Sequence, residues 1–200
     1  MGQRAITIYT PEGTAPHISA EDDAFIHRCA FGGTSGILGS LSCVRVDDNT
    51  VRLSGGGVSN RGYILRIPDG ENVELAVDNG EPGKNRIDAV AAVFTKGGGD
   101  VADTHSFAVV KGTSAAGSPA APALADSAPA SVGDVCRLAL FYVSITGTQI
   151  TGVSRVAPSL PASGSLPSVT YGSAAPSGGS EGSSVTATGI LSLSTVFPPV

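Results

Sequence analysis

The fold is decided by residues 82–94, whose sequence is PGKNRIDAVAAVF. Pro82 and Gly83 are typical of a turn, and the apolar run that follows them predicts a β-strand. Beyond Asp88, the side chains that alternate between the two faces of this strand are apolar on both faces. Such a strand is expected in the middle of a sheet that is covered on both sides.

Arg86 and Asp88 stand two positions apart at the start of this strand, so their side chains point to the same face. Because their charges are opposite, the spacing predicts a partly buried structural pair in which each side chain neutralises the other. This is a feature of architecture and not a catalytic motif.

The rest of the chain predicts a mainly β fold, either a β-sandwich or a barrel-like body, with one short helix and an extended C-terminal arm. Short apolar or alternating runs are separated by turn residues, such as those at 47–49, 68–70 and 78–80. An Ala-, Ser- and Pro-rich segment is expected to lack regular structure over residues 112–134. The predicted strands cover residues 5–9, 41–46, 50–54, 62–67, 73–77, 86–95, 106–111, 135–145 and 149–156.

The single predicted helix begins after Ser19, whose hydroxyl can cap the first turn, and three acidic residues follow it at 21–23. Phe25, Ile26 and Cys29 supply an apolar stripe, and Gly32-Gly33 ends the helix. The three cysteines, Cys29, Cys43 and Cys136, have no metal-binding or disulfide-framework spacing. They are interpreted as small buried apolar residues.

Composition narrows the functional classes. Charged residues make up only 14% of the chain, and there are 27 glycines and 13 prolines. Sparse charge, abundant glycine and the lack of tryptophan indicate short strands, many turns and surface that other protein covers. The net charge of −5 gives no support for nucleic-acid binding, and no apolar stretch is long enough to predict a membrane span.

No residues predict catalysis, a cofactor or a metal site. His17, His27 and His105 lie far apart, and none has a recognised ligand spacing. Asp100 and Asp103 together with His105 form the best alternative, a loose cation site, but they match no calcium-loop pattern. The chain is therefore expected not to be an enzyme.

The sequence divides into a body, residues 1–157, and a low-complexity arm, residues 158–200. The arm carries one charged residue, Glu181. Ordering each residue costs about 1–2 kcal/mol of backbone entropy, which serine and glycine side chains cannot recover, so contacts with neighbouring subunits must supply the difference. We expect residues 189–196 to add a strand to a neighbour within a homotrimer or larger ring. The side chains expected to pack there are Ile190, Leu191, Leu193, Val196 and Phe197.

Residues 18–157 resemble bacteriophage and prophage tail and baseplate structural proteins, including upper-baseplate and fibre-anchoring proteins. The resemblance is carried by the order and spacing of the helix, the 44–53 hairpin, the 84–94 strand, residues 107–113 with the Ala/Pro-rich loop, and residues 138–145. It implies a virion protein assembled in the host bacterial cytoplasm, which bridges the tail core to fibres or receptor-binding proteins. It implies neither nucleic acid nor membrane as a partner.

Two other functions are weighed against this one. A receptor-binding protein that recognises host-surface carbohydrate is the main alternative, but sugar platforms commonly use exposed aromatic side chains. The chain has only four tyrosines and six phenylalanines, and most occupy predicted strand positions. A tail enzyme that degrades peptidoglycan or polysaccharide lacks a convincing acid/base pair. The structural function is therefore favoured.

Overall fold

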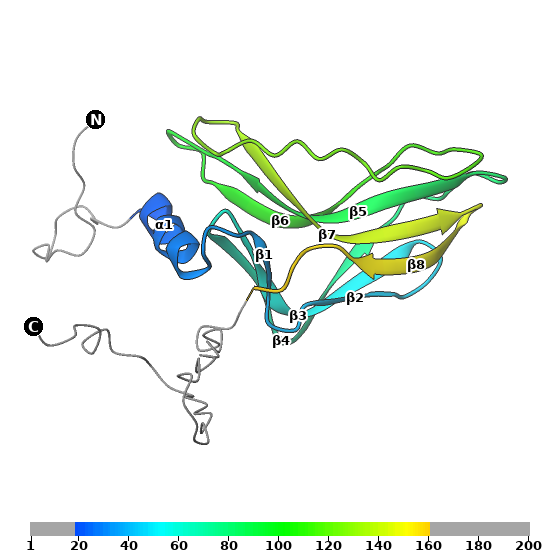
Figure 1. The fold of residues 1–200 in the computed structure, drawn as a ribbon, viewed down its shortest axis with the longest axis horizontal. Helices are drawn as coiled ribbons and strands as arrows, with labels where there is room; N and C mark the ends of the chain where they lie inside the picture. Colours follow the sequence, from blue (N-terminus) through cyan, green and yellow to red (C-terminus); the bar gives the residue numbers. More distant parts are fainter. Residues whose placement is uncertain (1–18, 161–200) are drawn as a thin grey trace, which may run out of the picture. The chain divides into compact units, whose positions relative to one another are not determined.

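Eight β-strands and one helix form the part of the chain that the computed structural model describes, residues 19–160 (Figure 1). This mainly β architecture with one short helix confirms the predicted fold class. The elements are α1 (Ala20–Ala30), β1 (Gly36–Leu38), β2 (Ser42–Arg45), β3 (Thr50–Asn60), β4 (Tyr63–Ala76), β5 (Asn85–Thr95), β6 (Thr104–Val110), β7 (Val135–Thr146) and β8 (Gln149–Arg155).

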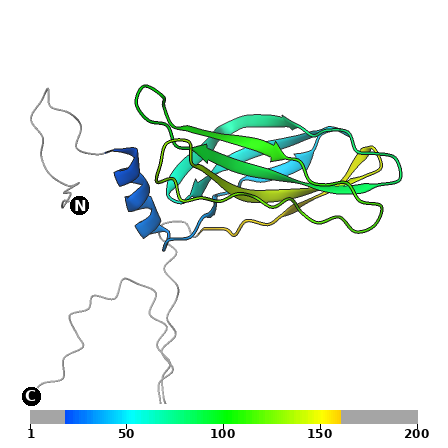
Figure 2. The same ribbon diagram turned by 90° about the horizontal axis from the view of Figure 1, so that it is seen from above.

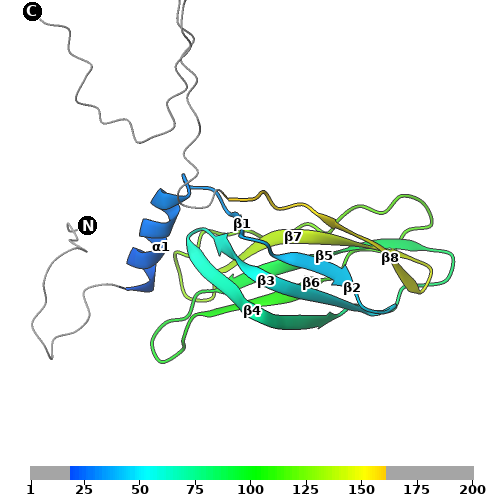
Figure 3. The same cartoon turned by 90° about the horizontal axis from the view of Figure 1, so that it is seen from below.

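The strands form two antiparallel sheets of four strands each. In the first sheet β3 is central, with β1 and β2 paired along one edge and β4 along the other. The second sheet has the order β6-β5-β7-β8. The two sheets face each other, and seen from above one sheet lies over the other (Figure 2). β4 and β6 lie along one side, and β2 and β8 lie along the other (Figures 1 and 3). Apolar side chains from both inner faces make one continuous core.

β5 is a central strand with both faces covered, as residues 82–94 predict. Val90 and Ala92 on its inner face belong to the core between the sheets. Ala89 and Ala91 on its outer face are also fully buried. Residues 111–134 form a long loop that lies over this outer face, and Figure 1 shows it above β5 and β6. The Ala- and Pro-rich loop thus serves as the third layer of this half of the body.

The turn predicted at residues 68–70 is wrong, because β4 runs through it as one long strand. The pairing of β4 with β3 jumps from Ser54↔Asn72 to Gly56↔Ile67, so four residues of β4 bulge opposite the single residue Gly55. Pro68 can occupy this position because β4 is an edge strand, where a missing N–H breaks no ladder hydrogen bond. The turn-forming residues lie in this bulge, and the chain does not reverse direction there.

The N-terminal cap of α1 is confirmed. The residues that the helix buries, however, are not those of the predicted apolar stripe. The Ser19 hydroxyl accepts from the Asp22 amide, and the Asp22 carboxylate accepts from the Ser19 amide. Phe25 and Ile26 are exposed, however, and the buried residues are Asp22 and Ala24. The helix packs through Ala24 against Gly62, where an added Cβ would lie only 1.9 Å from the Ala24 carbonyl oxygen.

The cysteines also differ in part from the prediction. Cys136 is buried and Cys43 is half-buried, but Cys29 is exposed on α1. The prediction of small buried apolar residues is therefore wrong for Cys29. Its position on the helix face that turns away from the sheets accounts for the difference.

Strand β1 and the segment 158–160 that bonds to it have no counterpart among the predicted strands. Ile37 of β1 accepts from the Leu160 amide and donates its own amide to the Pro158 carbonyl. Ala157 and Leu160 are buried, so residues 158–160 belong to the body although the sequence places them in the arm. The strand predicted at residues 5–9 lies outside the described residues, as does the chain after Leu160.

Candidate functional site

The Arg86–Asp88 pair is a two-pronged salt bridge inside the body. The Arg86 Nε lies 2.8 Å from Asp88 Oδ1, and Arg86 Nη2 lies 3.0 Å from Oδ2. The side chains are 2% and 0% exposed, so the pair is fully desolvated, which is more than the partial burial that the spacing predicts. Both residues occupy the inner face of β5, in line with Val90 and Ala92.

Hydrogen bonds from this pair join three segments of the chain. Arg86 donates to the backbone carbonyls of Asp78 and Asn79, at 2.5 and 3.1 Å, in the connection between β4 and β5. Asp88 Oδ1 accepts from the Gly112 amide at 2.8 Å, where the long loop leaves β6. The charges are thus satisfied, as buried charges must be. The pair therefore fixes where two loops begin.

Gly112 brings the loop close enough to reach Asp88. A Cβ added to Gly112 would lie 2.0 Å from the carbonyl oxygen of Ile87. Only glycine fits this approach without moving the backbone, and this requirement is not visible in the sequence.

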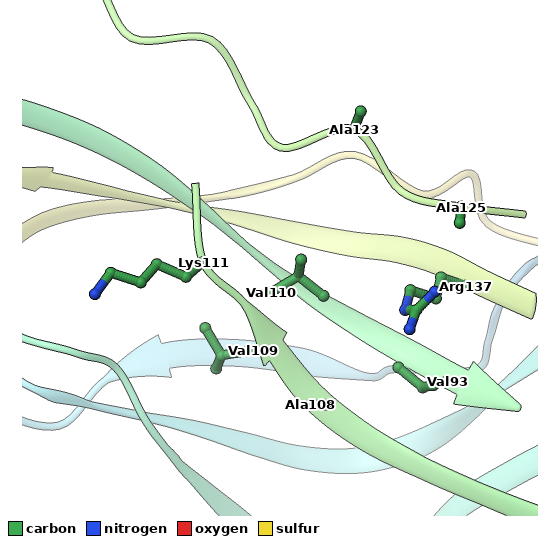
Figure 4. Close-up of a pocket in the computed structure, with 8 residues that line it drawn as sticks. All are labelled: Val93, Ala108, Val109, Val110, Lys111, Ala123, Ala125 and Arg137. Carbon is green, nitrogen blue, oxygen red and sulfur yellow. The ribbon is translucent and has the colours of Figure 1, made fainter. Parts of the chain in front are cut away.

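A groove lies between the loop and the outer face of the second sheet (Figure 4). Its volume is about 500 Å³. Lys111 and Arg137 project among apolar residues, and no carboxylate lines the groove. Lys111 pairs with Asp78, whereas Arg137 forms no ion pair with any described residue. The lining residues are Val93, Ala108, Val109, Val110, Lys111, Ala123, Ala125 and Arg137.

The returning end of the loop is anchored by Asp126. Its two carboxylate oxygens accept from Arg61 at 3.1 and 2.8 Å, and one of them accepts from the Cys136 thiol at 3.1 Å. Burial, together with the hydrogen bond to Asp126, raises the pKa of Cys136 to about 11. The thiol is therefore protonated at neutral pH and serves as a hydrogen-bond donor.

Five exposed apolar side chains belong to segments at the end of the body that carries α1, and we call this set the α1-end patch. The Lys96–Glu21 ion pair joins α1 to the hairpin between β5 and β6, and Gly98 of that hairpin lies against Val132. Phe25 is 53% exposed and Val132 is 69% exposed. The patch consists of Phe25, Ile26, Ile64, Val101 and Val132. In the sequence, the apolar stripe on α1 indicates this patch, but the stripe gives no sign that it faces outward.

The alternative cation site does not assemble. Asp103 accepts from the Gly97 amide at 2.7 Å and so closes the hairpin. His105 packs edge-on against the Phe94 ring at 5.6 Å between centroids, and burial lowers the pKa of His105 to about 4. Within residues 19–160, no cluster of three or more His, Cys, Asp or Glu side chains could hold a metal ion.

Of the other residues singled out in the sequence, only His27 lies in the described part of the chain. A ring nitrogen of His27 lies 3.1 Å from the Gly62 carbonyl oxygen, where it helps to fix α1, and His17 lies outside the described residues. The five predicted arm residues also lie outside the described residues: Ile190, Leu191, Leu193, Val196 and Phe197. Their role stays a prediction.

Comparison with known proteins leaves the family open. No protein-family model matches the chain, and no curated protein is significantly similar to it. In the described part of the chain, α1 falls short of the length and apolar character that crossing a bilayer requires.

Proposed function

We propose that the chain is a structural subunit of a bacteriophage tail or baseplate, which oligomerises and bridges the tail core to fibres or receptor-binding proteins. The proposal combines the resemblance of residues 18–157 to such proteins with one observation on the structure. That observation is the α1-end patch, whose five apolar side chains are exposed in the described part of the chain. Exposed apolar patches of this kind are typical of protein–protein interfaces.

The architecture supports a scaffold role in a second way. The ends of the long loop are fixed at Gly112 by Asp88 and at Asp126 by Arg61. A surface that is held by buried and two-pronged contacts presents the same shape to each neighbour, which lowers the entropy cost of assembly. The proposed mechanism is therefore association of a preformed body, with no bond made or broken.

The alternative is a receptor-binding protein that recognises host-surface carbohydrate. In the described residues the contacts between aromatic rings are an internal stack of Tyr63 on Phe94, with ring centroids 3.9 Å apart, and the edge contact of His105 with Phe94. Phe25 is the one large exposed aromatic side chain of this part. The structural proposal is therefore favoured, because a sugar platform of several stacked rings is not formed here.

The experiment that tests the proposal is antibody labelling of particles from the bacterial strain that encodes the chain. We expect electron microscopy to show label at tails or baseplates, and glycan arrays probed with the full chain to remain negative. Label absent from tail particles would contradict the proposal. Specific binding to a glycan, lost when Phe25 is replaced by alanine, would favour the alternative.

A further inference from the structure

β6 is an edge strand that lacks the usual protection against pairing with another chain. It is the terminal strand of its sheet, with β5 as its one ladder partner. Its seven residues, THSFAVV, include no lysine, no other fully charged side chain and no proline. Natural edge strands are commonly protected by such residues or by a bulge, and the pairing of β6 with β5 is regular throughout.

Two other edge strands, β4 and β8, differ from β6 in this respect. β4 carries Pro68, the bulge beside it and two glutamates. β8 carries Arg155 and is followed by a segment in which Val156 and Ala157 donate to Leu140 of β7 and Ser159 pairs with Ile37 of β1. Outside the β5–β6 ladder, no backbone hydrogen bond within the described part of the chain involves residues 104–110. The outward backbone groups of β6 are thus available to a further strand.

The side chains beside this edge indicate what kind of strand fits. Phe107 and Val109 point to the inner face of β6, where they pair across from Ala92 and Val90. They are only partly buried and pack on the rim of the core, as Leu65 does on β4. Ser106 and Ala108 point to the opposite face. A complementary strand would therefore place apolar side chains on one face and small polar ones on the other.

The middle of residues 189–196 of this chain, GILSLSTV, has that pattern. Leu191 and Leu193 fall on one face of an extended strand, and Ser192 and Ser194 fall on the other, between Ile190 and Val196. The segment has no charge, so nothing in it opposes the uncharged edge of β6. Its length of eight residues also matches the seven residues of β6.

We propose that β6 accepts residues 189–196 of a second copy as an added strand, with Leu191 and Leu193 covering Phe107 and Val109. This inference rests on the proposed function, because it names the contact by which copies assemble. A second copy is the chosen donor because Leu160, the last described residue, bonds to β1. β1 belongs to the other sheet and lies along the edge of β3 opposite to β4. Leu160 therefore lies at the edge of the sandwich opposite to β6, which favours a donor in a second copy.

Hydrogen exchange of the full chain tests the pairing. Amides of residues 104–110 should exchange at least 10-fold more slowly in the parent than in the variant Leu191→Ser/Leu193→Ser, while residues 71–76 of β4 serve as an internal reference. Ser192→Ala is the matched control and should leave the rates as in the parent. Equal exchange in parent and double variant would overturn the proposal.

Disulfide trapping identifies the donor. Copies with Ser106→Cys are mixed with copies that carry Ser192→Cys or Ser194→Cys, all in a Cys29→Ser background, and Ala76→Cys on β4 replaces Ser106→Cys as the control. We expect disulfides between copies to form at least 10-fold faster with the β6 cysteine than with the β4 cysteine. Equal rates would overturn the proposal, as would a bond within single chains that carry both cysteines. If the chain still forms oligomers in that case, only this contact is wrong, whereas a monomeric parent would also remove the proposed function.

Discussion

The guanidinium group of Arg86 binds the carboxylate of Asp88 through two hydrogen bonds in the interior of the sandwich. Breaking a buried pair leaves one charge unpaired in a dry environment, which typically costs about 3–5 kcal/mol. We therefore expect Asp88→Ala to lower the free energy of unfolding by about that amount, measured by urea denaturation. Arg52→Ala, which breaks an exposed pair with Glu74, is the control and should have a much smaller effect. An Asp88→Ala variant as stable as the parent would contradict the buried placement.

The same pair allows a sharper test in which both charges are removed together. Replacing a buried ion pair by apolar residues of similar size is often neutral or stabilising. We expect Arg86→Met/Asp88→Leu to be more stable than Asp88→Ala, because neither charge is then left without its partner. A double variant that is less stable than Asp88→Ala would show that the hydrogen bonds to Gly112, Asp78 and Asn79 matter more than the charge balance.

Gly112 is expected to tolerate no side chain. A methyl group there would meet the Ile87 carbonyl oxygen at 2.0 Å, so Gly112→Ala should shift the backbone and weaken the bond to Asp88. Overpacking of this kind commonly costs about 1–3 kcal/mol. Gly117→Ala is the matched control, because nothing lies within 4 Å of an added Cβ there. Thermal melting of both variants checks the prediction, and equal melting temperatures would refute it.

The free energy of unfolding should decrease as the pH is lowered, because His105 becomes protonated. Burial lowers the pKa of His105 from 6.5 to about 4, so between these values the unfolded chain binds a proton that the folded protein does not. This contribution to stability is complete above pH 6.5 and is lost as the pH falls toward 4, and its size is on the order of 1–3 kcal/mol. His105→Gln should lose less stability than the parent over this interval in urea denaturation. Identical pH profiles would contradict the prediction.

The α1-end patch should contribute to assembly more than to folding. Phe25 and Ile26 are exposed, so the variant Phe25→Ser/Ile26→Ser should melt within a few degrees of the parent. If the patch is an interface, the variant should assemble at least 10-fold more weakly in sedimentation velocity. Val44→Ser, an exposed apolar position on β2, is the control. Unchanged assembly of the double variant would exclude this patch as an interface between copies.

The β architecture could be predicted from the sequence because β5 has two apolar faces and because the turn residues separate most strands. The long strand β4 could not be predicted, since Pro68 and Gly70 have the same local preferences in a bulge as in a turn. The spacing of Arg86 and Asp88 predicted their pairing, but the carbonyls and the Gly112 amide that satisfy the pair come from segments that only the fold brings together. Likewise, the apolar residues of α1 were visible, but their outward direction depends on the contact of Ala24 with Gly62.

The mass of the full chain in solution tests whether the protein is an assembling tail subunit. Sedimentation equilibrium over a range of concentrations should give a trimer or a larger closed ring, as expected for a subunit that assembles around a tail axis. The same measurement on the Leu191→Ser/Leu193→Ser variant should give a smaller species. A parent chain that remains monomeric at every concentration would show that the protein is not such a subunit.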